Sequence, residues 1–219
     1  MGEQIAKLLI DVYSDVVCPW CYVGKRRLER ALTSVGSDVH VTWRPFQLNP
    51  TMPLDGMDRK TYLEAKFGSL EAFGRMEEQL ITAGAGERIP FAFEKIQRTP
   101  NTFAAHRLIW YAERQGKQDA MVEALFHGYF VEGRDIGKII TLVQMAAQAG
   151  LERTKAESFL HGDKGTAEVK QEEAGGRRLG IRAVPYFVLN QAYGISGAQP
   201  VDIFVSAIEK IQAKGTVGR

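Results

Sequence analysis

Two cysteines, Cys18 and Cys21, are the residues of this chain best suited to covalent chemistry. They are the only cysteines among 219 residues, so the only disulfide that one chain can form joins them. The thiolate is the reactive form of cysteine, and in Cys-X-X-Cys motifs the thiol pKa falls from about 8.5 to between roughly 3.5 and 7.5. The pair predicts a centre that cycles between dithiol and disulfide. We expect Cys18 to be the exposed attacking thiolate and Cys21 to resolve the mixed disulfide.

Two other interpretations of the motif are weaker. A structural zinc site needs two further ligands with a suitable spacing, and the four histidines are scattered along the chain at His40, His106, His127 and His161. A purely structural disulfide that closes so short a loop constrains the unfolded chain little. The sequence therefore predicts no metal site and favours redox chemistry.

The segments on either side of the cysteines predict how they are held. Residues 8–13 form a nearly continuous apolar run, which predicts a strand buried on both faces, and residues 23–32 favour a helix. Pro19 suits the first position of that helix. Cys18 is then the N-cap, next to free backbone N–H groups and the positive end of the helix dipole. We expect this helix end, together with the basic run 25–27, to stabilise the Cys18 thiolate.

The two ends of the chain contain the remaining strand signal. Alternating apolar and polar residues predict a strand over 39–43, which Pro45 and the following loop end. Strands are predicted again at 184–189 and 192–196, and an amphipathic helix follows Pro200. The order is strand–helix–strand at one end and strand–strand–helix at the other.

The middle of the chain reads as helical. From about residue 58 to 162 apolar residues recur at helical spacing, and strand signal nearly vanishes. Asn101 is predicted as the N-cap of one helix, and Thr154 with Glu157 as a capping box for another. The aromatic residues of this region are assigned to the core, because such side chains are usually buried.

With this order of elements the chain resembles the DsbA-like thioredoxin family. It is most similar to the cytoplasmic FrnE-like branch, which neighbours the 2-hydroxychromene-2-carboxylate isomerases and the kappa-class glutathione transferases. The resemblance implies an α/β protein, a thioredoxin fold with an all-helical insertion. Its thioredoxin-like domain is expected at 1–55 and 163–219, and the helical insertion at 56–162. The motifs that carry the resemblance span the chain: Ser14-Asp15-Val16-Val17-Cys18-Pro19-Trp20-Cys21, Pro45-Phe46-Gln47-Leu48-Asn49-Pro50, Asn101-Thr102-Phe103-Ala104-Ala105-His106-Arg107, Gly180-Ile181-Arg182-Ala183-Val184-Pro185-Tyr186-Phe187 and Ser196-Gly197-Ala198-Gln199.

The resemblance also implies further site residues. Pro185 is expected to follow a cis peptide bond and to face the two cysteines, with the Val184 backbone turned outward to pair with an extended peptide. Pro19 and Trp20 are expected to shape access to the thiols. These four residues are the predicted substrate-binding positions.

The roles of four polar residues stay open at this stage. Asp11 and Asp15 lie near the motif, but neither falls on the position of the buried acid of many thioredoxins, and solvated or N-cap roles are expected. His106 and Arg107 have two interpretations. One directs them toward the thiolate, and the other makes His106 a hydrogen-bonded residue within the helical middle.

Charge and hydropathy bear on partners and location. The net charge is +2, from 28 basic and 26 acidic residues, and no basic run exceeds three residues, which argues against nucleic acid. No apolar segment approaches the ~20 residues that span a bilayer. The first seven residues lack the pattern of a secretory signal. We expect a cytosolic protein without a membrane partner.

Three functions remain from different classes. The first is a thiol–disulfide oxidoreductase that acts on disulfide-containing proteins or peptides, without a bound cofactor and with glutathione as an alternative redox partner. The second is a glutathione-dependent transferase or isomerase. Against it, relatives of that kind usually carry serine in place of Cys18 and an aspartate–arginine pair where this chain has Gln199-Pro200. The third is a redox-switched holdase. The sequence predicts neither the redox potential nor the oligomeric state.

Overall fold

A four-stranded sheet forms the centre of the computed structural model, which describes residues 8–36 and 39–217. The strand order is β2-β1-β5-β6. β1 pairs in parallel with β2, with Leu8 opposite Val39, and antiparallel with β5, with Ile10 opposite Leu189. β5 and β6 form an antiparallel hairpin. The bounds are β1 Leu8–Ser14, β2 Val39–Pro45, β5 Tyr186–Leu189 and β6 Tyr193–Ser196.

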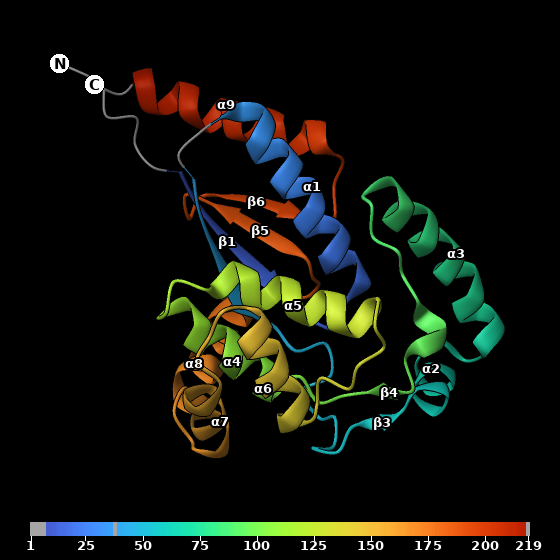
Figure 1. Ribbon diagram of the computed structural model, residues 1–219. Helices are drawn as coiled ribbons and strands as arrows, with labels where there is room; N and C mark the ends of the chain where they lie inside the picture. Colours follow the sequence, from blue (N-terminus) through green and yellow to red (C-terminus); the bar gives the residue numbers. More distant parts are fainter. Residues whose placement is uncertain (1–7, 37–38, 218–219) are drawn as a thin grey trace.

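Two helices cover one face of this sheet (Figure 1). They are α1, Pro19–Val35, and α9, Val201–Val217. Phe187 of β5 is fully buried and meets the Phe204 ring of α9 edge-on, with ring centroids 4.8 Å apart. The ends of the chain therefore share one core, as the sequence predicts.

The opposite face is covered by α8, Thr166–Arg178. The backbone of Gly176 lies against the Tyr13 ring, where an added Cβ would come within 2.5 Å of a ring carbon. This cover reaches only one end of β1. Leu9 lies on the same face of β1 as Tyr13, and Leu9 is 42% exposed. The prediction of a strand buried on both faces is therefore wrong at Leu9.

Helices also fill most of the stretch between β2 and α8. The predicted helices are present, but a two-stranded sheet of β3 and β4 was not predicted. Its strands have two residues each, too few to show an alternating pattern. The bounds are β3 Met57–Asp58, α2 Arg59–Phe67, α3 Leu70–Gly86, a 3₁₀ turn Phe93–Lys95, β4 Arg98–Thr99, α4 Phe103–Glu113, α5 Gln118–Phe130, α6 Ile139–Gln148 and α7 Arg153–His161.

Helix capping differs in detail from the sequence prediction. The cap of α7 is Glu152, whose carboxylate accepts hydrogen bonds from the backbone N–H groups of Thr154 and Lys155. The predicted Thr154–Glu157 capping box is therefore wrong. Before α4 the N-cap position falls to Thr102, but Asn101 still accepts the Phe103 N–H, at 2.9 Å.

Helix α5 packs along α1 through aromatic rings and buried charge. Tyr22 of α1 stacks on Phe126 with ring centroids 5.0 Å apart. The Lys25 side chain is only 2% exposed and lies among the carboxylates of Glu29, Asp119 and Glu123. A buried ammonium group needs such partners, since desolvation of an unpaired charge is costly.

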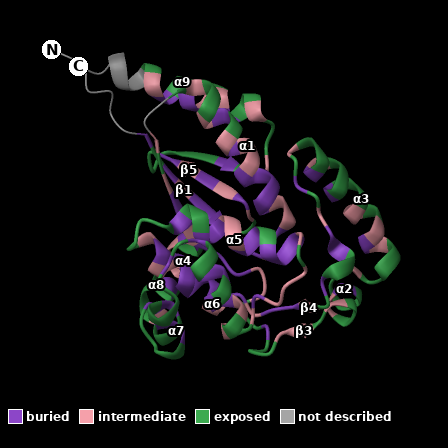
Figure 2. Ribbon diagram, in the orientation of Figure 1, coloured by how far each residue is buried: buried purple, intermediate pink, exposed green. Residues whose placement is uncertain are grey.

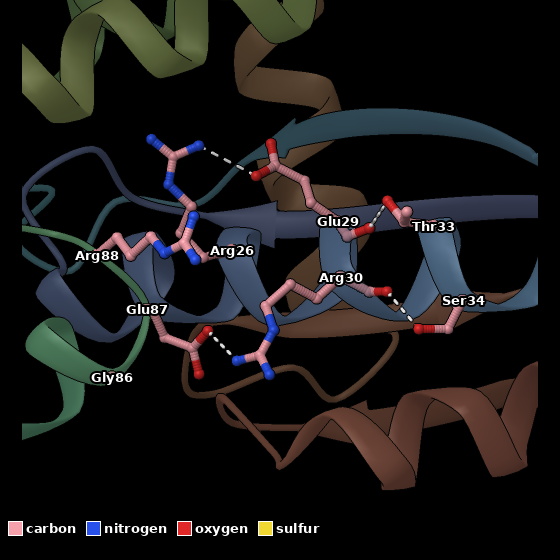
Figure 3. A pocket seen from close by; sticks show the side chains of 8 residues that line it. All are labelled: Arg26, Glu29, Arg30, Thr33, Ser34, Gly86, Glu87 and Arg88. Atoms are coloured by element: carbon pink, nitrogen blue, oxygen red, sulfur yellow. Dashed lines mark hydrogen bonds and ion pairs between the residues drawn. The ribbon is translucent and has the colours of Figure 1, made fainter.

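Helix α3 is tied to α1 at its carboxyl end. The Glu87 side chain is 6% exposed and accepts from Arg27 at 2.9 Å and from Arg30 at 2.8 Å. Figure 3 shows the ion pair between Glu87 and Arg30, both of which line a pocket between α1 and the end of α3. This contact fixes α3 beside the helix that begins at the two cysteines.

Burial follows the sheet and the helix faces turned toward it (Figure 2). Phe187 lies in this layer. We expect Phe187→Ala to lower the free energy of unfolding by ~3–5 kcal/mol, because it leaves a cavity between β5 and α9. The melting temperature should fall by roughly 10 °C.

Leu54→Ala is the matched control, because Leu54 is 85% exposed. Calorimetry of both variants separates the effects. Equal shifts in melting temperature would contradict the packing of Phe187.

Candidate active site

The two cysteines lie where β1 passes into α1. Cys18 is the N-cap of α1, with extended backbone angles, and Pro19 opens the helix. The Cys18 N–H donates to the Asp15 carbonyl at 2.9 Å, and the Cys21 N–H donates to the Cys18 carbonyl at 3.0 Å. Both side chains are free thiols. The predicted placement of the motif at a strand-to-helix turn is confirmed.

The Cys18 thiol is directed at the second segment of the site. Its Sγ lies 3.6 Å from the Val184 carbonyl oxygen, to which the thiol donates. The Val184–Pro185 peptide bond is cis, as the resemblance implied. Cys18 is 6% exposed, so the expectation of an exposed thiol is wrong.

The Cys21 thiol lies deeper. The residue has no exposed surface. Burial raises the pKa of the Cys21 thiol well above its usual range, and the neighbouring Cys18 raises it further. The Ser14 hydroxyl and the Asp15 backbone act in the opposite direction. Burial therefore disfavours the Cys21 thiolate and shields the sulfur from solvent.

The basic run at 25–27 does not serve the thiolate, contrary to the sequence prediction. Lys25 is occupied by the acids that pack α5 on α1. Arg26 pairs with Glu123, and Arg27 with Glu87. These side chains leave α1 toward α5 and the end of α3, where their acidic partners Glu123 and Glu87 lie. The backbone N–H groups of the first turn remain as the source of positive potential at Cys18.

Asp15 takes a buried position, and the expected solvated or N-cap role is wrong. It has no exposed surface, and its Oδ2 accepts the Leu48 N–H at 2.7 Å. Its Oδ1 lies 3.4 Å from His106 Nε2 of α4, without the alignment of a hydrogen bond. His106 is thus brought to the cysteine segment. The interpretation of His106 as a hydrogen-bonded residue within the helical middle is wrong for its Nε2, which has no hydrogen-bond partner among the described residues.

Arg107 points elsewhere. Its guanidinium donates to backbone carbonyls around the end of α7, among them Gly162 at 2.6 Å and Lys164 at 2.8 Å. It therefore holds a helix end, and the interpretation that directs it toward the thiolate is wrong.

The loop after β2 is clamped beside the cysteine segment. The Gln47 N–H donates to the buried Glu173 carboxylate at 3.0 Å, and Arg177 donates to the Gln47 carbonyl at 2.9 Å. With the Leu48–Asp15 bond, two buried carboxylates hold consecutive residues of this loop.

A pocket of about 120 Å³ opens next to the cysteine motif. Pro19 and Trp20 line one side, and α2 and α3 supply apolar residues on the other. Arg59 and Lys66 also line it, and the Arg59 guanidinium lies over the Phe73 ring, 5.6 Å from its centroid. The core assignment of the aromatic residues from the helical middle holds for Phe73, Phe93, Tyr129 and Phe130, which are buried. The same residues also line this pocket, which the sequence did not predict. The pocket suits one apolar group that carries a negative charge nearby.

Two other kinds of site are missing from residues 8–36 and 39–217, a metal centre and a membrane span. No group of three His, Cys, Asp or Glu side chains gathers there to hold a metal ion. Within the same residues, none of the helices has the length and hydropathy to cross a membrane.

The depth of the two thiols generates a labelling prediction. At mildly acidic pH, iodoacetamide should modify Cys18 well before Cys21. The raised pKa of Cys21 leaves too little of the reactive thiolate, and its burial blocks the reagent. Mass spectrometry of the labelled peptide measures the order. Cys18→Ser and Cys21→Ala give the rate of each thiol alone, and faster labelling of Cys21 would reverse the assignment.

Solved structures share this arrangement of elements. A probable DsbA oxidoreductase, SCO1869 from Streptomyces coelicolor, is 33% identical, covers 97% of this chain and 91% of its own, and has a TM-score of 0.86. A 2-hydroxychromene-2-carboxylate isomerase is 15% identical over 95% and 98% of the two chains, with a TM-score of 0.73. The cytosolic disulfide reductase DsbM of Pseudomonas aeruginosa, solved with GSH, is 19% identical over 94% and 99%, with a TM-score of 0.66. The thioredoxin-type fold expected from the sequence is confirmed.

Sequence comparison agrees with the structures. The uncharacterized protein YwbO of Bacillus subtilis (strain 168) is 30% identical over 208 residues, which are 94% of this chain and 98% of that protein. The sequence profile of the DSBA-like thioredoxin domain matches residues 9–209. By this match, which covers most of its length and both cysteines, the chain belongs to the family of DSBA-like thioredoxin domains.

Proposed function

We propose that this protein is a thiol–disulfide oxidoreductase of disulfide-containing proteins or peptides, with Cys18 as the attacking and Cys21 as the resolving cysteine. The observation that carries the proposal is the placement of the only two cysteines. Both are free thiols in the first turn of α1, one directed at the Val184 carbonyl and the other fully buried.

The reaction follows from this difference in depth. The Cys18 thiolate attacks one sulfur of a substrate disulfide, and the other substrate sulfur leaves as a thiolate. The mixed disulfide places the Cys18 sulfur next to Cys21, which attacks it and releases the second substrate thiol. The substrate gains two electrons, and the cysteine pair becomes a disulfide. In the opposite direction the same steps oxidise a substrate dithiol, and the redox potential of the pair sets which direction dominates.

Substrate recognition is proposed to use residues on both sides of Cys18. The Val184 carbonyl, already directed at the thiol, would accept a backbone N–H of an extended substrate segment, with Pro185 beside it. Pro19 and Trp20 would direct a neighbouring apolar side chain into the pocket that they line. The proposal also assigns residues 56–162 to a helical insertion, whose α2 and α3 form the far wall, between the two parts 1–55 and 163–219 of the thioredoxin-like domain.

A glutathione-dependent activity is the second candidate. Its support is the pair of cations, Arg59 and Lys66, at the pocket beside Trp20, since glutathione carries two carboxylates. Glutathione is accordingly the proposed small redox partner in either case. The place of action is proposed to be the cytosol.

Trapping the intermediate distinguishes the candidates. Cys21→Ala removes the resolving thiol, so the mixed disulfide on Cys18 should persist. In extract of the source cells we expect mainly protein adducts, seen as high-mass bands that disappear with reductant. The purified wild-type protein should also reduce insulin in the presence of a thiol donor.

Control variants and the kind of adduct separate the candidate functions. Cys18→Ser should trap nothing, because an unactivated alcohol does not attack a disulfide. A Cys21→Ala protein that carries only a glutathione adduct would favour the second candidate. Absence of any adduct, together with suppression of aggregation by a cysteine-free variant, would favour a holdase instead.

Trp20 offers a test of the binding pocket. Trp20→Ala should raise KM for a disulfide peptide ~3- to 10-fold, from the lost aromatic contact. Steady-state kinetics with one peptide measures it. Tyr193→Ala, which truncates a 41% exposed aromatic side chain on β6, is the control and should leave KM unchanged. Equal effects of the two variants would contradict the role of Trp20.

A further inference from the structure

A small internal cavity lies where the end of β1 meets α4. Ser14 and Val16 line it from the cysteine side, and His106, Ile109 and Trp110 line it from α4. The cavity leaves about 10 Å³ for the centre of a water molecule. That is close to the smallest space that holds one water.

Three of the lining residues bury a polar atom that has no hydrogen-bond partner among the described residues. These atoms are Ser14 Oγ, His106 Nε2 and Trp110 Nε1. Buried polar atoms in native proteins are almost always satisfied by the protein or by ordered water. Their gathering at one cavity of this size is typical of a hydrated site, because a dry cavity is lined by apolar groups.

Charged groups meet His106 and the cavity from three elements. The Asp15 carboxylate, from the turn before α1, lies 3.4 Å from His106 Nε2. Glu172 of α8 and Arg44 of β2 line the cavity and lie 3.5 Å from each other. The buried Asp15 carboxylate thus faces the ring nitrogen of His106 that borders the cavity. Glu172 is 26% exposed, so it connects the cavity to solvent.

Ser14 links this cavity to the reacting thiol. Its hydroxyl lowers the pKa of the Cys21 thiol but has no hydrogen-bond partner among the described residues, so it is free to turn between the thiol and the cavity. Burial works against the Cys21 thiolate, so Cys21 cannot release its proton directly to bulk water. The proton needs an internal acceptor.

We propose that His106 accepts the proton of Cys21 during the resolving step, passed through the Ser14 hydroxyl and a water in the cavity. Asp15 is then a positioning residue for His106. The inference rests on the proposed function, which assigns the resolving role to Cys21.

The step balances in atoms and electrons. The Cys21 sulfur loses its proton to the relay and forms a bond to the Cys18 sulfur. The bond between the Cys18 and substrate sulfurs breaks, and its electron pair leaves with the substrate thiolate. The protonated His106 returns its proton to solvent by way of Glu172. When the cysteine disulfide is reduced, the relay runs backward and protonates Cys21.

The test uses the aromatic disulfide 5,5′-dithiobis(2-nitrobenzoate) with the reduced full-length protein in excess. Attack by Cys18 releases one coloured thiolate at a rate that depends on protein concentration. Resolution by Cys21 releases a second coloured thiolate, at a rate that is independent of protein concentration. Because this leaving group needs no proton, the second phase reports removal of the Cys21 proton.

We expect His106→Gln to slow the second phase relative to the first by ~10-fold at neutral pH, a modest share of the usual effect of a general base. The rates of the second phase in the variant and in the wild-type protein should become equal as the pH rises, because hydroxide then removes the Cys21 proton. His127→Gln is the control, since its side chain is 48% exposed on α5, and it should match wild type.

Other outcomes would contradict either the relay or the resolving role of Cys21. An unchanged second phase, or a slowing that is the same at every pH, would overturn the relay and leave His106 a structural residue. Absence of a second release in the wild-type protein would overturn the resolving role of Cys21, and with it the proposed function. If His106→Gln does not fold, Ser14→Ala decides. This variant should slow the second phase ~3-fold or more at neutral pH, and its rate should approach that of the wild-type protein as the pH rises. An unchanged rate would overturn the relay.

Discussion

The site depends on one approach of two distant segments, the start of α1 and the loop before β5. Cys18 Sγ and the Val184 carbonyl oxygen lie 3.6 Å apart although the two residues are separated by 166 positions. The helix reaches this loop because Gly24 has no side chain there. A Cβ would lie 3.0 Å from Pro185 Cγ and 3.1 Å from Phe187 Cζ. Any side chain at position 24 that moves α1 outward therefore also separates the Cys18 thiol from the backbone that we propose to bind substrate.

Buried carboxylates hold the segments that surround this approach. Asp15 accepts the Leu48 N–H, and Glu173 accepts the Gln47 N–H. Hydrogen bonds to a buried charged acceptor are stronger than bonds between neutral groups, and each acid is expensive to bury without them. The loop after β2 is thus fixed by groups from β1's end and from α8. The same loop contributes Leu48 to the pocket beside Trp20, so the shape of that pocket depends on these acids.

The fold and the two cysteines were predictable because their signals are local. The Cys-Pro-Trp-Cys turn, the alternating strands and the amphipathic helices each lie within a short window of sequence. The contact between Asp15 and His106 was not predictable, because it joins residues far apart in the sequence and neither has a spacing that marks it. The pocket was hidden for another reason: aromatic residues at helical spacing look alike whether they face a core or a cavity. The basic run at 25–27 misled because its charges are neutralised by Glu87 and Glu123, which only the folded structure brings close.

The two thiols differ in depth, and the basic residues 25–27 are paired with acids of neighbouring helices and of α1 itself. The potential of a helix end acts within its first turn, where Cys18 stands as the N-cap. Cys21, one turn further in, loses contact with water entirely. Burial raises the pKa of the Cys21 thiol and so favours its protonated form. In the cycle that we propose, burial opposes removal of the Cys21 proton. A hydrated path from Ser14 to His106 is the kind of structure that such a buried nucleophile requires.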